Sequence, residues 1–167
     1  MDDPNYHFSL RKVIKADKDL LFNWSNDPDV RKWSFSKRAI AVNEHTIWFE
    51  KKYNDPNVLM WIFENNNSPS GLVRVEKDNS EVVLNYLIAS QSRGKRLASI
   101  MLKMAMIEVR GHWQNVKVLA YTLPGNIASI KSLEKAGFFL DNLSDNKNCY
   151  VFYEPKKLVQ PDNNENR

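Results

Sequence analysis

The sequence predicts a mixed α/β (α+β) fold, with a central, largely antiparallel sheet of six to seven strands flanked by about four helices. The expected order of elements is one strand, two helices, three strands, a helix, a strand, a helix and two strands, and this order favours a sheet covered by helices. The chain has 167 residues, the length of one ordinary domain. No internal repeat or linker divides it, so residues 1–154 are expected to form a single domain.

The first three expected elements are a strand and two helices. Residues 7–14 alternate apolar and polar side chains, which indicates a strand. A helix over residues 16–25 should end at the sequence NDPDV, because proline disfavours a helical conformation in the residue before it. Residues 42–55 form the second expected helix, with Asn43 as its N-cap and with Ile47 and Trp48 facing inward.

The middle of the chain has the pattern of three consecutive strands. These strands are expected at residues 58–64, 72–77 and 81–89. The segments between them, NNNSPSG at 65–71 and DNS at 78–80, consist of residues that favour turns. Short turns of this kind join neighbouring strands of a sheet.

A helix, a strand, a short helix and a hairpin complete the expected domain. The third helix should run to about Arg110 and end at Gly111, a residue type common just after helices. A strand over 116–122 comes next, and then a loop and a short helix within PGNIASIKSLEKAGF. Residues 138–143 and 149–153 should form the closing hairpin. Residues 155–167 are polar, with proline and several asparagines, and are expected to be a mobile tail.

Composition excludes several classes of function. A net charge of +4 suits an anionic ligand but is too weak to indicate nucleic-acid binding, and no nucleic-acid-binding motif is present. One cysteine, Cys149, rules out an intrachain disulfide, and three separated histidines give no metal-ligand spacing. No signal peptide and no apolar run of membrane-spanning length are found, so we expect a cytoplasmic protein without a metal.

The stretch YLIASQSRGKRLASIMLKMAM has the form of an anion site at the start of a helix. A strand ends, a basic turn comes after it, and a long amphipathic helix begins, which leaves backbone N–H groups free to attract an anion. Gly94 would let a phosphate approach the backbone, and Arg93, Lys95 and Arg96 add positive charge. A solvated basic turn would show the same pattern, so this stretch alone does not decide between an anion site and an ordinary turn.

This stretch resembles the acetyl-CoA loop of the GNAT superfamily of N-acetyltransferases, whose pattern is Q/R-x-x-G-x-G/A. Gln91, Gly94 and Arg96 hold the three fixed positions, and the next residues, Leu97 and Ala98, also fit the family. Arg96 departs from the pattern, since family members usually carry Gly or Ala there. The resemblance implies that these residues, with Arg93 and Lys95, bind the pyrophosphate of acetyl-CoA.

A second match strengthens the resemblance. NIASIKSLEKAGF, residues 126–138, is similar to the later motif of the superfamily, in which the asparagine contacts the pantetheine arm. On its own Asn126 would equally suit a helix N-cap. The resemblance extends over roughly residues 8–153 and implies a GNAT-like fold, acetyl-CoA as the cofactor, and cofactor contacts from Ser129 and Ser132.

The family fold also implies how the reaction is helped. The strand with LNYLIA is expected to splay from the strand with VKVLAYT, so that its unpaired backbone groups hold pantetheine. A backbone N–H near Leu87 or Ile88 would then stabilise the oxyanion of the attacked thioester. Binding both reactants side by side supplies much of the rate, so no covalent enzyme intermediate is needed.

The groups that move protons stay open at this stage. Many relatives have a tyrosine acid where this chain has Leu133, and Ser129 either assists the leaving sulfur or only binds the cofactor. Many relatives also carry a carboxylate base where this chain has Val83. Glu81, acting through water, and Tyr86 are candidate bases, although an amine of moderate pKa needs none.

The N-terminal half suggests the acceptor. FNWSNDPDVRKWSF and HTIWFEKK resemble GNAT proteins that acetylate nucleotide-linked amino sugars of the pseudaminic-acid pathway type. Arginine and histidine side chains could meet the pyrophosphate and a tryptophan could stack on the base, although tryptophans are often core residues and arginines often lie on the surface. The candidate acceptor residues are Trp24, Asn26, Arg31, His45, Trp48 and Arg74.

Two other interpretations remain open. A protein N-terminal acetyltransferase of the ribosomal-protein type shares NIASIKSLEKAGF, but it should have a groove for an extended peptide. An inactive GNAT-like acyl-CoA-binding module would explain Leu133 and Arg96. Dimers are common in the superfamily, so the resemblance also allows a homodimer.

Overall fold

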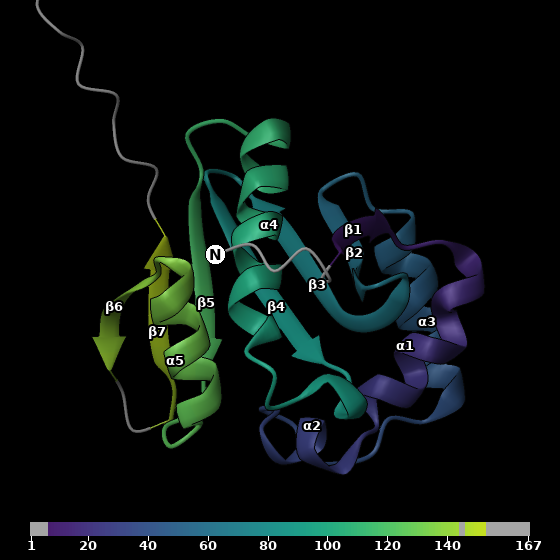
Figure 1. Ribbon diagram of the computed structural model, residues 1–167. Coiled ribbons are helices and arrows are strands. Elements are labelled where there is room, and N and C mark those ends of the chain that lie inside the picture. Colours follow the sequence, from purple (N-terminus) through teal and green to yellow (C-terminus); the bar gives the residue numbers. More distant parts are fainter. Residues whose placement is uncertain (1–6, 144–145, 153–167) are drawn as a thin grey trace, which may run out of the picture.

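A seven-stranded sheet runs through the part of the chain that the computed structural model describes, residues 7–143 and 146–152, in the order β1-β2-β3-β4-β5-β7-β6 (Figure 1). Neighbouring strands are antiparallel except β4 and β5, which are parallel. The predicted, largely antiparallel sheet is confirmed. The expected tail at 155–167 lies outside the described residues. The strands are β1 Phe8–Lys12, β2 Val58–Asn65, β3 Ser68–Asp78, β4 Glu81–Ile88, β5 Lys117–Thr122, β6 Phe139–Leu143 and β7 Asn148–Phe152.

The described residues form five α-helices, one more than the four predicted. The additional helix is α2, which is separated from the end of α1 by two residues. Pro28 suits a first helical position, and the Asp27 carboxylate accepts hydrogen bonds from the N–H groups of Asp29 and Val30. No described helix is long and apolar enough to cross a membrane. The helices are α1 Lys18–Ser25, α2 Pro28–Lys32, α3 Val42–Tyr53, α4 Leu97–His112 and α5 Ile127–Ala136.

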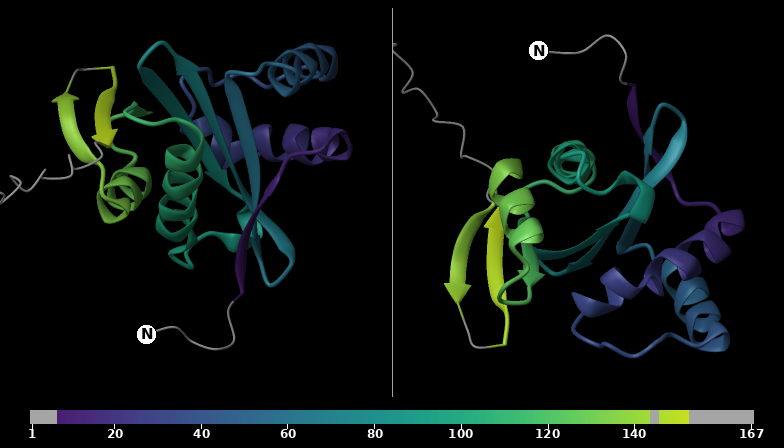
Figure 2. Two further views of the ribbon diagram at one scale, coloured as in Figure 1. Left: turned by 90° about the horizontal axis from the view of Figure 1, so that it is seen from above. Right: turned by 60° about the horizontal axis from the view of Figure 1, so that its bottom comes forward.

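Helices cover the sheet on two sides (Figure 2). Successive residues of a strand face opposite sides, and β2 shows this clearly, because Trp61 and Phe63 belong to the core under α4 and α5. Met60 and Ile62 face the other way and pack with buried residues of α1 and α3. The sheet is therefore the middle of three layers, and α2 lies beside the lower end of β4 (Figure 1).

The orientation predicted for α3 is partly wrong. Ile47 is 70% exposed, and the inward-facing residues are His45 and Phe49, which are four positions apart and so share one face of the helix. Trp48 is half-buried, as expected. Asn43 lies inside the helix, whose N-cap is Ala41.

Two predicted boundaries also differ. Helix α4 includes Gly111 and ends at His112, with Trp113 as its C-cap, because Gly111 keeps a helical backbone and a positive φ is absent there. The turn expected over 65–71 is confined to Asn66 and Asn67, which have φ of 51° and 60°. Asparagine tolerates this left-handed conformation, so two residues suffice to join β2 and β3.

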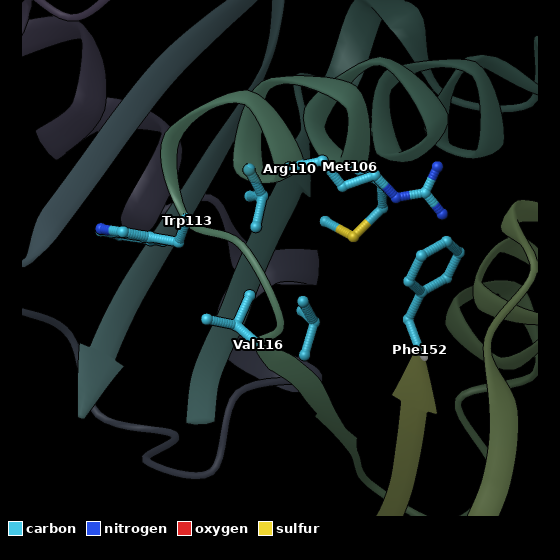
Figure 3. A pocket seen from close by; sticks show the side chains of 7 residues that line it. Met106, Arg110, Trp113, Val116 and Phe152 are labelled. Atoms are coloured by element: carbon cyan, nitrogen blue, oxygen red, sulfur yellow. The ribbon is translucent and has the colours of Figure 1, made fainter. Parts of the chain in front are cut away.

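A small hollow lies at the C-terminal end of α4, between this helix and β5 and β7 (Figure 3). Met106, Trp113, Val116 and Phe152 line it, and the guanidinium of Arg110 lies 4.8 Å from the centre of the Phe152 ring. Its volume of about 10 Å³ is at most that of one water molecule. It is a packing gap, too small for a substrate.

Candidate active site

The site forms where β4 and β5 separate. β4 pairs with β3 along its whole length, from Glu81 to Ile88, but it pairs with β5 only as far as Leu84, opposite Ala120. Beyond this point the strands diverge, as predicted, and the described structure gives the last four residues of β4 no ladder partner on the β5 side. Backbone N–H and C=O groups that lack a ladder partner can bind a ligand with amide groups.

A cleft of about 720 Å³ opens at this separation, a size typical of small-molecule sites. One wall consists of β4, the loop before α4, the end of β5 and the start of α5. The opposite wall consists of α2 and the residues after it, Trp33 to Phe35. We call this second wall the acceptor wall. The predicted site residues that line the cleft are Tyr86, Leu87, Ile88, Arg93, Gly94, Arg96, Leu97, Ala98, Asn126, Ser129 and Ser132.

The loop before α4 has the backbone form of an anion cradle. Gly94 and Arg96 both have left-handed conformations, with φ of 75° and 60°, and α4 begins at Leu97 directly after them. No side chain of the described structure caps the N-terminus of α4, so its first N–H groups remain available to a ligand. Gln91 and Lys95 are exposed and are not among the residues that line the cleft.

The loop pattern Q/R-x-x-G-x-G/A also fits in a second register that the sequence analysis missed. In this register Arg93, Arg96 and Ala98 occupy the fixed positions. The structure favours it, because the left-handed residue immediately before α4 is Arg96 and the pattern has glycine there. In either register Arg96 is the residue that departs from the pattern.

The Arg96→Gly variant is expected to be more stable than the natural chain. A left-handed backbone costs a residue with a side chain roughly 1–2 kcal/mol, whereas the added flexibility of an unfolded glycine costs about 0.5–1 kcal/mol. The relief is larger, so the free energy of unfolding should rise by roughly 0.5–1 kcal/mol, measured by urea denaturation. Lys95→Gly is the control and should lower stability, because the φ of Lys95 is not positive. An equal loss in both variants would contradict this account.

Tyr86 and the start of α5 form a hydrogen-bonded group in the cleft. The Asn126 side chain caps α5 by accepting a 3.2 Å hydrogen bond from the Ser129 N–H. The Ser129 and Tyr86 hydroxyls are 2.7 Å apart, while the Ser132 hydroxyl donates to the carbonyl of Ala128. Burial raises the pKa of Tyr86 to about 12, although hydrogen bonding to the serines partly opposes this shift. Tyr86 is therefore protonated at neutral pH.

Other residues considered for proton transfer lie elsewhere. Leu133 is fully buried in the core below α4 and α5, so its position does not face the cleft. Glu81 is exposed at the start of β4, where its carboxylate is 3.8 Å from the Lys117 ammonium group. It is absent from the described residues that line the cleft.

The acceptor wall contains residues that sequence reasoning missed. Trp33 and Phe35 line the cleft and are 38% and 58% exposed, which is high for aromatic side chains, and Asp29 and Ser34 lie beside them. Their sequence signal was the segment WSF directly after NDPDVRK. This segment carries a family likeness, but its pattern cannot show which of its residues face a ligand.

Two of the predicted acceptor residues form hydrogen bonds that hold this wall in place. The Asn26 side chain donates to the Ile40 carbonyl and accepts from the Ile40 N–H, at 3.1 and 2.8 Å. The Arg31 guanidinium donates to the Ser34 hydroxyl at 3.0 Å and to the Ser36 carbonyl at 3.2 Å. Neither residue is among the described residues that line the cleft.

The other four predicted acceptor residues lie on the α1 and α3 side of the sheet. His45 is buried among Phe22, Trp48 and Phe49, and this burial lowers its pKa. The Arg74 guanidinium lies 5.0 Å from the centre of the Trp48 ring and forms a 2.8 Å ion pair with Glu76. Trp24 packs against the core on this side. The residues that line the cleft do not include Trp24, His45, Trp48 or Arg74, within the described part of the chain.

The geometry of the cleft agrees with the family whose model matches the chain. The family model described as "Acetyltransferase (GNAT) domain" matches residues 7–139. The chain belongs to this family. It is therefore an acetyl-CoA-dependent N-acetyltransferase, and the cleft between β4 and β5 is its candidate active site. No curated protein sequence matches the chain.

Solved structures share the GNAT fold. A domain from Methanocaldococcus jannaschii has a TM-score of 0.78 at 23% identity, covering 89% of this chain and 99% of its own. Spermidine N-acetyltransferase from Vibrio cholerae, in complex with CoA and spermine, has a TM-score of 0.74 at 17% identity, covering 88% and 94%. An aminoglycoside acetyltransferase in complex with coenzyme A has a TM-score of 0.70 at 18% identity, covering 88% and 95%.

Proposed function

We propose that this GNAT enzyme acetylates a primary amine of a small molecule by direct attack in a ternary complex, with Tyr86 and Ser129 as the proton source. The observation that carries this proposal is the 2.7 Å contact between the two hydroxyls inside the cleft. The contact lies beside the diverging ends of β4 and β5, where both reactants can be bound together. Bringing reactants together in this way supplies a large share of the rate.

The residues of the cleft fit acetyl-CoA, which supplies an activated acetyl thioester when bound. The free N–H groups at the start of α4, with Gly94 and Arg96 before them, suit a pyrophosphate. The end of β4 at Leu87 and Ile88 has no ladder partner on the β5 side, so it suits the amides of pantetheine, and a backbone N–H there can stabilise a developing negative charge on a carbonyl oxygen. Asn126 lies at the start of α5 on the same wall.

Tyr86 acts in this proposal as a proton donor. With a pKa of about 12 its hydroxyl carries a proton at neutral pH and cannot accept a second one as a base. A serine hydroxyl is a poor acid alone, but Ser129 hydrogen-bonded to Tyr86 can pass a proton to a leaving sulfur and regain it from Tyr86. The attacking amine loses its own proton to water, and Tyr86 regains a proton from water, so the proton count of the reaction is balanced.

For the acceptor we propose the amino group of a nucleotide-linked deoxy-amino sugar. This proposal rests on the likeness of residues 22–35 and 45–52 to such enzymes and on the exposed rings of Trp33 and Phe35, which can stack on a planar base. Arg31, Arg74 and His45 are already paired or buried. Contacts with the nucleotide would therefore come mainly from the acceptor wall.

A second candidate acceptor is a polyamine or an aminoglycoside. Two of the structural neighbours are named for such substrates or are bound to them. The cleft does not favour a polycation. Arg93 and Arg96 line it, and the carboxylate of Asp29, which also lines it, is already paired with Arg93. Peptide N-termini of the ribosomal-protein type are a third candidate acceptor. The alternative to all three acceptors is an inactive acyl-CoA-binding module.

Release of free thiol from acetyl-CoA tests these candidates. The panel contains a UDP-linked 4-amino-dideoxyhexose, spermidine, kanamycin and peptides with free N-termini. We expect turnover with the nucleotide sugar and little with the other acceptors. Activity on peptides or polyamines alone would refute the sugar proposal, and cofactor binding without turnover on any amine would favour the inactive module. A cytoplasmic location and a homodimer remain predictions.

A further inference from the structure

The side chain of Arg93 joins the two walls of the cleft. Its Nε donates a 3.1 Å hydrogen bond to the carbonyl of Ile88, at the end of the strand that is expected to hold pantetheine. The other two nitrogens reach across to α2, where Nη2 lies 2.8 Å from Asp27 Oδ1 and Nη1 lies 3.0 Å from Asp29 Oδ2. One side chain thus connects the end of β4 to the start of the acceptor wall, more than sixty positions away in the sequence.

The link to Asp27 is the stronger of the two. Asp27 is 21% exposed, whereas Asp29 is 70% exposed, where solvent and salt weaken an ion pair. Partial burial alone would raise the pKa of Asp27, but the hydrogen bonds from Arg93 and from the Val30 N–H outweigh it, so the pKa lies below the usual range. Asp27 is therefore ionised at neutral pH and can form the ion pair with Arg93.

Helix α2 depends on contacts with other segments to hold its position. It has five residues, none of which is fully buried, and a helix this short is not stable on its own. Asn26, just before α2, is hydrogen-bonded to Ile40, and Arg31, within α2, is hydrogen-bonded to Ser36. Those contacts shape the acceptor wall, but they do not connect it to the cofactor loop as the Arg93 contacts do.

We propose that Arg93 is a positioning residue that transmits the order of the cofactor loop to the acceptor wall through Asp27. A ligand that fixes the loop before α4 also fixes the Arg93 side chain, and with it α2 and the aromatic residues after it. The acceptor wall then becomes ordered when the cofactor is present. This inference rests on the proposed function only for the location of the cofactor, and its test needs no acceptor.

Amide hydrogen exchange of the full chain, with and without saturating coenzyme A, tests the coupling. In the natural chain coenzyme A should slow exchange in residues 94–99, the loop and first turn of α4, and should also slow exchange in residues 28–36 about tenfold, a typical size for coupling between sites. In Asp27→Asn the slowing over 94–99 should persist, while that over 28–36 should fall below twofold. In Arg93→Gln, measured at a coenzyme A concentration that saturates the variant, the slowing over 28–36 should also fall below twofold. Asparagine caps helices as well as aspartate does, so Asp27→Asn removes the charge and keeps the cap.

Arg38→Gln is the matched control. Arg38 forms a bidentate ion pair with Glu44 in the first turn of α3, but this pair does not reach the cofactor loop. Arg38→Gln should therefore keep the slowing in both segments. If Arg93 only bound phosphate, Asp27→Asn would behave like the natural chain, and that result would overturn the proposal. Unchanged coupling in Arg93→Gln, or slowing confined to 94–99 in the natural chain, would overturn it as well.

The same experiment separates this proposal from the proposed function. If coenzyme A slowed exchange nowhere in the natural chain, the cofactor would not bind at this site, and both proposals would be refuted. Slowing in both segments, combined with inactivity on every amine of the panel, would leave the coupling supported and refute only the proposed acceptors.

Discussion

Replacing Tyr86 with phenylalanine is expected to lower kcat by about 10²-fold, the smaller end of what a positioned proton donor contributes. The phenyl ring keeps the packing of Tyr86 against the core below α4, so the strand should stay in place. The variant loses only the hydroxyl that lies 2.7 Å from the Ser129 hydroxyl. Steady-state thiol release measures kcat, and calorimetry should show an acetyl-CoA dissociation constant within about twofold of the natural one, since the lost group acts on the leaving sulfur.

The double variant identifies the pair as one unit. Ser129→Ala alone should cost about as much as Tyr86→Phe alone, and the double variant should be little worse than either, because groups that act together are not additive. Tyr53→Phe is the control, since Tyr53 packs on Phe49 away from the cleft. Losses that multiply in the double variant would show two independent roles. A loss of cofactor affinity equal to the loss of kcat would make the pair a binding element.

The pH dependence separates a donor from a base. A group with a pKa of about 12 keeps its proton up to about one unit below that value, so Tyr86 should cause no loss of activity between pH 7 and 10. Activity in that range should rise only through deprotonation of the amine substrate and then level off. If Tyr86 acted as the base, kcat would instead keep rising about tenfold per pH unit toward pH 12 in the natural chain, and Tyr86→Phe would abolish this rise.

The cofactor half of the site could be predicted because its signals are local. Gly94 and the start of α4 are neighbours in the sequence, and the Asn126 cap concerns only the next three residues. A backbone-built site of this kind leaves its pattern in consecutive residues. The splay of β4 from β5 came from the family likeness, since no periodicity shows where a strand ladder stops.

The acceptor half could not be predicted in the same way. Asn26 and Arg31 looked like ligand-binding residues in the sequence, yet the Asn26 amide is hydrogen-bonded to Ile40, and both terminal guanidinium nitrogens of Arg31 are hydrogen-bonded to Ser34 and Ser36. Which polar side chains are left for a ligand depends on these contacts within the wall. The bridge from Arg93 to Asp27 spans 66 positions, a pairing that no local pattern can reveal.

The wrong orientation of Ile47 has a related cause. Hydrophobicity favoured Ile47 as an inward residue, but the side of α3 that meets the sheet is fixed by Phe49, and His45 shares its face at helical spacing. A histidine buried among aromatic rings is an arrangement that a hydrophobic pattern scores as polar and therefore outward.

Replacing Gly71 with alanine is expected to lower the free energy of unfolding by about 2 kcal/mol, within the range for an overpacked core. A Cβ at Gly71 would lie 2.8 Å from the Leu87 carbonyl oxygen and 2.9 Å from the Met101 sulfur. The Met101 side chain is flexible and can move at small cost. The Leu87 oxygen belongs to the backbone of β4, directly beside Ile88, which pairs with Gly71, so the strand itself must shift.

This shift distinguishes Gly71→Ala from a simple loss of stability. Thermal unfolding should show a midpoint lower by roughly 4–8 °C for a chain of this size. At a temperature where the variant is fully folded, its affinity for acetyl-CoA should also be lower, because the displaced end of β4 is the strand that we assign to pantetheine. Gly111→Ala is the control: a Cβ there meets nothing within 4 Å, and alanine favours the helix interior, so stability should rise by about 0.5–1 kcal/mol with cofactor affinity unchanged. A destabilised Gly71→Ala variant with full cofactor affinity would mean that the end of β4 does not contact the cofactor, and the assignment of Leu87 and Ile88 would have to be abandoned.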